Sequence, residues 1–281
     1  MRDFKGVDND KIQELFLKSL QDQSYKNFEL IITIFKEKNV ENTINKFNLP
    51  VRFFYCPSGD YKYSHTEVLL NCIKTARSNL ENCIIIWSTA DVIFENNFFE
   101  FINGNLPKYA VATSHPHIIY RSINDFITGE KPLLSLGTGM DVVIFDGLFF
   151  SNEEVVNDIE SYKNINWGLF EHFLSALAYL YAEHRINFYY QIKIKKIVND
   201  LKNLNENVPK QDNYNIVSFK NFLKDKKLSY NFFYLFWCNL VFDLHNSSRL
   251  RYYWDFKRYF ITKDFLFSLI PKKLKILIKK Q

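Results

Sequence analysis

A short apolar segment that ends beside a single acidic residue constrains this chain more than any other feature. Cys83-Ile84-Ile85-Ile86-Trp87 has the length and composition of a buried β-strand, and Ser88-Thr89-Ala90-Asp91 follows it directly. Side chains that follow buried strands of α/β proteins gather at the carboxyl edge of the sheet, where ligands bind. We therefore expect Asp91 to lie at such an edge. The alternative is that Asp91 only caps a helix or ends the strand.

The rest of the chain alternates helical and strand-like patterns. Amphipathic or apolar segments predict helices over residues 8–20, 40–47, 64–76, 98–102 and 167–182. Apolar segments predict strands over residues 28–35, 51–56, 83–87, 109–113, 117–120, 142–145 and 186–197. Strands that alternate with helices predict an α/β fold with a mostly parallel sheet flanked by helices.

Composition excludes several classes of protein. The chain has 281 residues, of which 47% are hydrophobic, so it can bury a substantial core. Glycine is scarce, and no segment matches a glycine-rich phosphate-binding pattern. The cysteines are scattered without CxxC spacing, which argues against a zinc site and favours a reducing compartment. No signal-peptide pattern is present, and no apolar stretch approaches the ~20 residues that span a bilayer.

Basic charge is concentrated near the carboxyl terminus. From Arg249 to Gln281 there are ten Lys or Arg and two Asp or Glu, a net charge of +8. Because the whole chain is only +5, the residues before Arg249 sum to −3, which argues against nucleic-acid binding by the body. Aromatic residues mixed with the basic ones predict a helical tail that binds an anionic membrane surface. The alternative is a set of ordinary, solvated packing helices.

The polar, Asn-rich segment 199–215 has the composition of a linker. We therefore predict an α/β domain over residues 1–200, and a linker with a helical, membrane-associated region over residues 201–281.

A second segment adds a resemblance to a known family. Residues Ser19 to Ile32 have the pattern of a helix end, a turn and a buried strand, with a Ser-Leu, Gln, Tyr and Asn-Phe-Glu series. With the strand that ends at Asp91, this series resembles the nucleotide-sugar half of family 2 glycosyltransferases of the GT-A fold. The resemblance covers roughly residues 10–200. It implies a glycosyltransferase of the bacterial surface-polysaccharide type, inverting and hexosyl-transferring, in the cytoplasm at the inner face of the membrane.

The resemblance also implies a donor site and a metal cofactor. Asp91 falls at the second Asp of the family's metal motif, which implies Mg²⁺ or Mn²⁺ at the donor diphosphate. Thr89 stands where the first Asp is expected, and its hydroxyl, like that of Ser88, can contact a ribose or a phosphate. Lys62 and His65 lie where the family contacts donor phosphates. The alternative for these two residues is simple solvent exposure.

A third segment supplies candidates for the acceptor side. In Asn166-Trp167-Gly168-Leu169-Phe170-Glu171-His172, the resemblance implies that Glu171 or His172 is the base that deprotonates the acceptor. Trp167 would line the sugar site, Gly168 would allow close approach, and Asp141 would contribute to the acceptor floor. The alternatives are core packing, a favourable charge at a helix start and a plain turn. His115 and His117 share one strand face, and we expect polar surface or acceptor contacts there rather than a metal pair.

Two departures from the family keep another function open. The chain enters its first helix almost at once, without the strand that usually holds the nucleobase. In addition, Thr33-Ile34-Phe35-Lys36-Glu37 replaces the usual Asp-Asp-Gly-Ser. We expect either a fragment or a rebuilt or inactive donor site. The alternative function is a non-catalytic GT-A domain that scaffolds polysaccharide enzymes at the membrane. A nucleotidyltransferase would need a Gly-rich amino-terminal loop, and the sequence has none.

Overall fold

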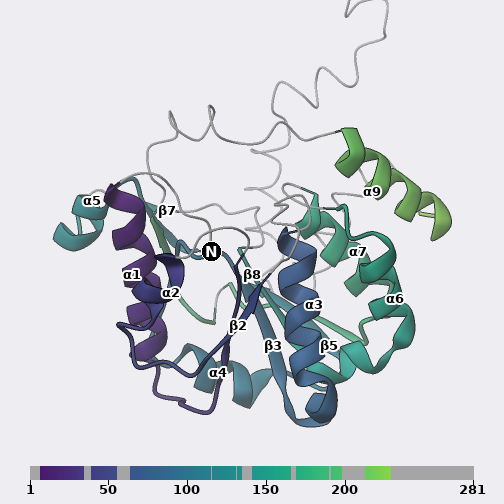
Figure 1. Cartoon of the computed structure of the whole chain (residues 1–281), viewed down its shortest axis with the longest axis horizontal. Helices are drawn as coiled ribbons and strands as arrows, with labels where there is room; N and C mark the ends of the chain where they lie inside the picture. Colours follow the sequence, from purple (N-terminus) through teal and green to yellow (C-terminus); the bar gives the residue numbers. More distant parts are fainter. Residues whose placement is uncertain are drawn as a thin grey trace, which may run out of the picture.

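Helices lie on both sides of centrally placed strands (Figure 1). The computed structural model describes residues 7–34, 39–55, 64–114, 116–130, 132–134, 141–165, 169–189, 191–197 and 213–228. The α-helices in this part are α1 (Val7–Gln21), α2 (Asn39–Ile44), α3 (Ser64–Ala76), α4 (Phe98–Asn105), α5 (Ile123–Thr128), α6 (Glu153–Ser161), α7 (Phe170–Tyr181) and α9 (Asn213–Asp225). Two 3₁₀ helices are η2 (Arg77–Asn82) and η3 (Gly147–Ser151).

The described strands pair into three sheets. They are β1 (Leu30–Ile34), β2 (Val51–Tyr55), β3 (Ile84–Ser88), β4 (Val92–Phe94), β5 (Ala110–Ser114), β6 (Ile118–Tyr120), β7 (Leu133–Leu134), β8 (Val142–Asp146), β9 (His184–Asn187) and β10 (Ile194–Ile197). Their orders are β1-β2, β4-β10-β6-β7 and β3-β8-β5-β9.

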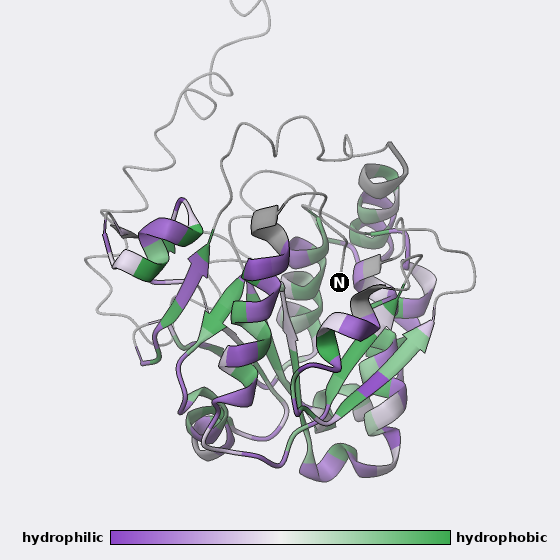
Figure 2. Ribbon diagram, turned by 60° about the vertical axis from the view of Figure 1, so that its left-hand side comes forward, coloured by the Kyte–Doolittle hydropathy of each residue, from purple (hydrophilic) through white to green (hydrophobic). Residues whose placement is uncertain are grey.

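The sheet β3-β8-β5-β9 is buried on both faces. Alternate residues of each strand enter different apolar clusters. Ile85 and Val143 pack with α3, α6 and α7, whereas Ile86 and Ile144 pack towards α1 and α4. Figure 2 shows the strands mostly in the hydrophobic colour, with hydrophilic colour on the outer helices. Burial on both faces explains why these strands have nearly continuous apolar sequences.

The α/β class is confirmed, but the prediction of a mostly parallel sheet is wrong for the described pairings. Strand β8 runs antiparallel to both β3 and β5, whereas β9 runs parallel to β5. The second sheet is also mixed, because β10 is parallel to β6 and antiparallel to β4. A doubly buried strand has the same apolar pattern in either direction, so its sequence does not reveal its orientation.

The single strand predicted over residues 186–197 is two strands in different sheets. Strand β9 pairs with β5, and β10 pairs with β4 and β6. The chain turns between them, where the Phe188 amide donates to the Thr113 carbonyl at 2.9 Å. Phe188 and Ile192 are buried although they lie in the turn. Their burial extends the apolar alternation across the turn, which explains the error.

The segment that suggested a family resemblance holds the chain around β4. Gln23 is fully buried, and its side-chain nitrogen donates to the carbonyls of Ser19 at 2.9 Å and Glu95 at 2.7 Å. Its side-chain oxygen accepts from the Phe99 amide at 3.1 Å. The Ser19 hydroxyl accepts from the Phe94 amide at 3.3 Å. The end of α1 is therefore tied to β4 and to the start of α4.

Helix α9 packs on the α/β body although it lies beyond the predicted boundary at residue 200. The Phe222 ring lies 4.8 Å from that of Phe173 on α7. Lys226, just after α9, lies 2.8 Å from an Asp158 carboxylate oxygen and donates to the Tyr181 hydroxyl at 2.7 Å. Three apolar residues of α9 are fully buried, namely Phe219, Phe222 and Leu223. The described part of the predicted region 201–281 thus completes the core. For the residues beyond Leu228, the predicted linker and helical region stay a prediction.

Replacing Gln23 by Met should lower the free energy of unfolding by about 2–4 kcal/mol, because it leaves buried backbone groups without partners. Urea denaturation followed by circular dichroism measures the change. Gln21→Met, at the partly exposed last residue of α1, is the matched control and should change stability by no more than about 0.5 kcal/mol. Equal effects of the two substitutions would contradict the role of Gln23.

Candidate functional site

One edge of the central sheet gathers the polar residues that follow its strands. Ser88 at the end of β3 and Ser114 at the end of β5 both lie opposite Val142, the first residue of β8. Thr89 and Asp91 continue from β3, and Asp141 immediately precedes β8. The predicted position of Asp91 at the carboxyl edge of a buried strand is the position found in the structure.

Backbone hydrogen bonds bring Asp91 and Asp141 into one site. The Thr89 amide donates to the Asp141 carbonyl at 3.2 Å, which joins the segment after β3 to the start of β8. The Ile197 amide donates to the Asp91 carbonyl, also at 3.2 Å, which places β10 beside Asp91. Two loops and one strand, distant in sequence, therefore meet at this point.

Lys196 of β10 bridges the two carboxylates. Its ammonium nitrogen lies 3.4 Å from Asp91 Oδ2 and also donates a hydrogen bond to Asp141 Oδ1. The side chain is only 18% exposed. Burial by itself would lower the pKa of Lys196, but the charges of Asp91 and Asp141 outweigh burial and raise that pKa above its ordinary value. We call Asp91, Asp141 and Lys196 the carboxylate–lysine triad.

Two oxygens beside the triad have no partner within the described part of the chain. Asp91 Oδ1 and Thr89 Oγ1 are both buried and make no hydrogen bond there. The Ser88 hydroxyl, by contrast, donates to the Thr89 carbonyl at 3.0 Å. Because buried polar atoms are nearly always paired, these two oxygens without a partner in the described residues indicate a place where a ligand or water binds.

Three aromatic rings connect this edge to the start of α7. Ring centroids of His65 on α3 and Phe170 on α7 lie 5.4 Å apart, and His65 lies 5.6 Å from Trp87 of β3. Trp87 and Phe170 are also 5.4 Å apart. Trp87 immediately precedes Ser88, and Phe170 immediately precedes Glu171. The predicted donor residue His65 and the first turn of α7 are thus neighbours of the end of β3.

The first turn of α7 presents two groups that can accept a proton. Glu171 and His172 are each partly exposed, and the Ser175 hydroxyl donates to the Glu171 carbonyl at 3.0 Å. Burial lowers the pKa of the His172 imidazole below its ordinary value of 6.5, so the ring is neutral at pH 7. His172 Nδ1 is buried and has no partner among the residues that the structure describes. Their roles as base stay predictions.

Four predicted site residues lie outside the described residues: Lys62, Trp167, Gly168 and His115. His117 is described, and its ring stacks on that of Tyr189 with centroids 4.1 Å apart and planes 8° apart. Burial, and then the charge of Lys193, lower the pKa of His117. Across the described ranges, no group of three or more His, Cys, Asp or Glu residues is placed to hold a metal.

Lys196 was missed by the sequence reasoning. The segment Ile194-Lys195-Lys196-Ile197 places two charges between fully buried isoleucines of a paired strand. A charged residue inside a half-buried strand needs a partner of opposite charge, which is a usable signal. The identity of the partners depends on strand register, which the sequence does not show.

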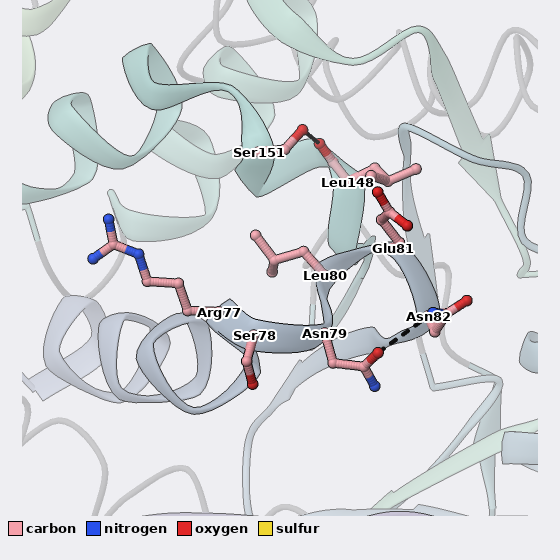
Figure 3. Close-up of a pocket in the computed structure, with 8 residues that line it drawn as sticks. All are labelled: Arg77, Ser78, Asn79, Leu80, Glu81, Asn82, Leu148 and Ser151. Atoms are coloured by element: carbon pink, nitrogen blue, oxygen red, sulfur yellow. Dashed lines mark hydrogen bonds between the residues drawn. The ribbon is translucent and has the colours of Figure 1, made fainter.

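A shallow cavity of about 320 Å³ lies at the opposite edge of the sheet (Figure 3). It is lined by η2, which leads into the start of β3, and by Leu148 and Ser151 of η3. The Asn82 amide donates to the Asn79 side chain at 3.4 Å, and the Ser151 hydroxyl donates to the Leu148 carbonyl at 2.6 Å. None of the predicted site residues lines this cavity, so we locate the candidate site at the triad.

The buried His172 predicts a dependence of stability on pH. Because its folded-state pKa lies below the unfolded value, the unfolded chain binds more protons, and the free energy of unfolding falls as pH drops below about 6.5. The slope from one such group reaches at most about 1.4 kcal/mol per pH unit. Denaturation between about pH 5.5 and 7.5 should therefore show a smaller slope for His172→Gln. An unchanged slope for His172→Gln would contradict the prediction.

Comparisons of the chain with models of protein families, with curated proteins and with solved structures found no match. The chemistry of the site is therefore argued from its own residues.

Proposed function

We propose that this chain is a GT-A-like glycosyltransferase that moves a sugar from a nucleotide-sugar donor to a glycan or lipid-linked acceptor. The observation that carries the proposal is the position of Asp91 directly after a buried strand, with one buried carboxylate oxygen unpaired within the described residues. Further support comes from the first turn of α7, which adjoins the same strand through Phe170 and Trp87. A donor site and a proton acceptor can share this edge.

The proposed reaction is a direct displacement. The acceptor oxygen attacks the anomeric carbon of the donor, and the bond from that carbon to the diphosphate breaks. The nucleoside diphosphate leaves with the bonding electrons, and the configuration at the anomeric carbon inverts. Glu171 takes the proton of the acceptor hydroxyl, or His172 does so in its place. Asp91 and Thr89 hold the donor, with His65 on α3 at its side.

The predicted Mg²⁺ or Mn²⁺ does not fit the observed arrangement. These cations take oxygen ligands, and among the described residues the triad offers two carboxylates, Asp91 and Asp141. The Lys196 ammonium already bridges these two groups. A divalent cation between these two carboxylates would have to displace the Lys196 ammonium. Strand β10, which carries Lys196, is held in place by pairing with β4 and β6. No step of the proposed reaction is therefore assigned to a metal.

One observation favours the alternative function, a GT-A-like domain that scaffolds other enzymes without catalysis. The same Lys196 bridge occupies an oxygen of each carboxylate, as expected if the pair had become purely structural. Release of nucleoside diphosphate from a nucleotide-sugar in the presence of acceptor distinguishes the two functions. Sustained release supports the transferase, and its absence across UDP-, GDP-, CDP- and dTDP-sugars supports the scaffold.

Substitutions at Asp91 and Glu171 should affect different steps. Asp91→Asn should weaken donor binding, because it removes a charge-assisted acceptor from the site. Glu171→Gln should keep donor affinity and reduce turnover by about 10²–10⁴-fold, the usual contribution of a general base. Isothermal titration measures binding, and a nucleotide-release assay measures turnover.

Two controls make this pair of substitutions decisive. Glu160→Gln changes an exposed residue on α6 and should leave both quantities at the parental level. His172→Ala tests the neighbouring ring. If Glu171→Gln turns over at the parental rate and His172→Ala is inactive, then His172 is the base. Full activity of both variants would move the base elsewhere, with Asp141 as the next candidate.

The basic tail is proposed to hold the protein at an anionic membrane face. Residues 249–281 lie outside the described residues. Among the helices that the structure does describe, none has the length and apolar character needed to cross a bilayer. Each basic residue near an anionic surface adds about 1 kcal/mol of binding free energy, which salt weakens. The full chain should therefore sediment with anionic liposomes at low salt, and a chain ending at Ser248 should not. Equal sedimentation of the two chains would contradict the role of the tail.

A further inference from the structure

The position of Lys196 is fixed by its backbone on both sides. Strand β10 lies between β4 and β6, with Lys196 opposite Val92 on one side and Ile119 on the other. The next residue, Ile197, donates its amide to the Asp91 carbonyl at 3.2 Å. Successive side chains of a strand point to opposite faces, so Lys196 points towards the triad and Lys195 points away. Strand β10 therefore cannot shift to carry the ammonium away from the carboxylates without breaking its pairing with β4 and β6.

The charges of the triad show why Lys196 lies between the two carboxylates. The Asp141 and Lys196 side chains are 17% and 18% exposed, and that of Asp91 is 37% exposed. Two carboxylates this close repel each other when they are shielded from water, so they need a cation between them. A divalent metal supplies that cation in many carboxylate sites. Here the ammonium of Lys196 supplies it.

We infer that Lys196 takes the place of a divalent cation in this site, so that ligands bind at the triad without metal. Two carboxylates and one ammonium leave the triad with a net charge of −1. Asp91 Oδ1, which has no partner within the described residues, accepts hydrogen bonds only, and Thr89 Oγ1, also without a partner there, accepts or donates. The triad is therefore suited to the hydroxyl groups of a ribose or a sugar, and a phosphate must bind to other elements.

The choice of a nucleotide-sugar as the ligand rests on the proposed function, whereas the replacement of the metal does not. The first experiment tests the replacement alone. Lys196→Met removes the ammonium that bridges the two carboxylates. This variant should gain a Mn²⁺ site, with an affinity on the order of tenfold or more higher than that of any Mn²⁺ site of the parent chain. Electron paramagnetic resonance of free Mn²⁺ measures the binding.

Matched variants define the source of the new site. Lys195→Met removes the neighbouring lysine, which points to the other face of β10, and should gain no site. The double variant Lys196→Met, Asp141→Asn should lose the site that Lys196→Met gains. Lys196→Gln is a second route if Lys196→Met does not fold. Absence of Mn²⁺ binding by folded Lys196→Met or Lys196→Gln would overturn the inference.

The second experiment uses the parent chain and separates the inference from the proposed function. UDP-, GDP-, CDP- and dTDP-sugars are titrated in excess EDTA and again with Mn²⁺. Equal affinity in the two conditions supports metal-free binding. Affinity that rises on the order of tenfold with Mn²⁺ overturns the inference and leaves the transferase proposal intact. A third outcome is that the parent chain binds no nucleotide-sugar in either condition, while Lys196→Met gains a Mn²⁺ site. That outcome overturns the transferase proposal and supports the replacement of the metal by Lys196.

Discussion

The buried amide of Gln23 is the interaction on which the geometry of the candidate site depends. It satisfies two carbonyls and one amide around β4, and so fixes the strand that follows Asp91. Strand β10 pairs with β4, and its register sets Lys196 beside Asp91. A neutral side chain at the end of the first helix therefore positions a charged group contributed by a much later part of the chain. Loss of these hydrogen bonds would act on the site through the backbone, not through any change in charge.

The central sheet explains why the candidate site lies at an edge of the sheet and not on one of its faces. Its strands are covered on both faces, so polar side chains reach a ligand only where strands end. Because β3 and β5 flank an antiparallel β8, their carboxyl ends meet the start of β8, and polar residues of three segments converge. At the other end of β3, a Cβ on Gly147 would lie 2.3 Å from the Leu80 carbonyl oxygen. The backbone of η3 therefore packs directly against that of η2 at this end of the strand.

Local sequence patterns predicted those parts of the structure whose burial is local. The strands over 28–35, 51–56 and 83–87 and the helix over 64–76 match β1, β2, β3 and α3 closely, because continuous apolar or amphipathic segments determine them. The same reasoning placed Asp91 at the strand edge. It could not find Lys196, because the contact of Lys196 with Asp91 depends on the register between β10 and β4, which local sequence does not determine. Nor could it separate β9 from β10, since the turn between them is as apolar as the strands. The roles of Glu171 and His172 stay predictions, because the local sequence indicates that a helix begins there but does not indicate what chemistry its side chains perform.

The packing of α9 has a consequence for how this chain can vary. Ile197 is held in a sheet, and Asn213 begins a helix that completes the core, so both ends of the intervening segment have fixed positions. The entropic cost of joining two fixed points grows only with the logarithm of the length of the connection, and doubling that length costs about 0.6 kcal/mol. Related chains can therefore differ widely in length between these two anchors and keep the same core. Shortening is bounded instead by the straight-line span between the anchors, since an extended residue reaches at most about 3.6 Å.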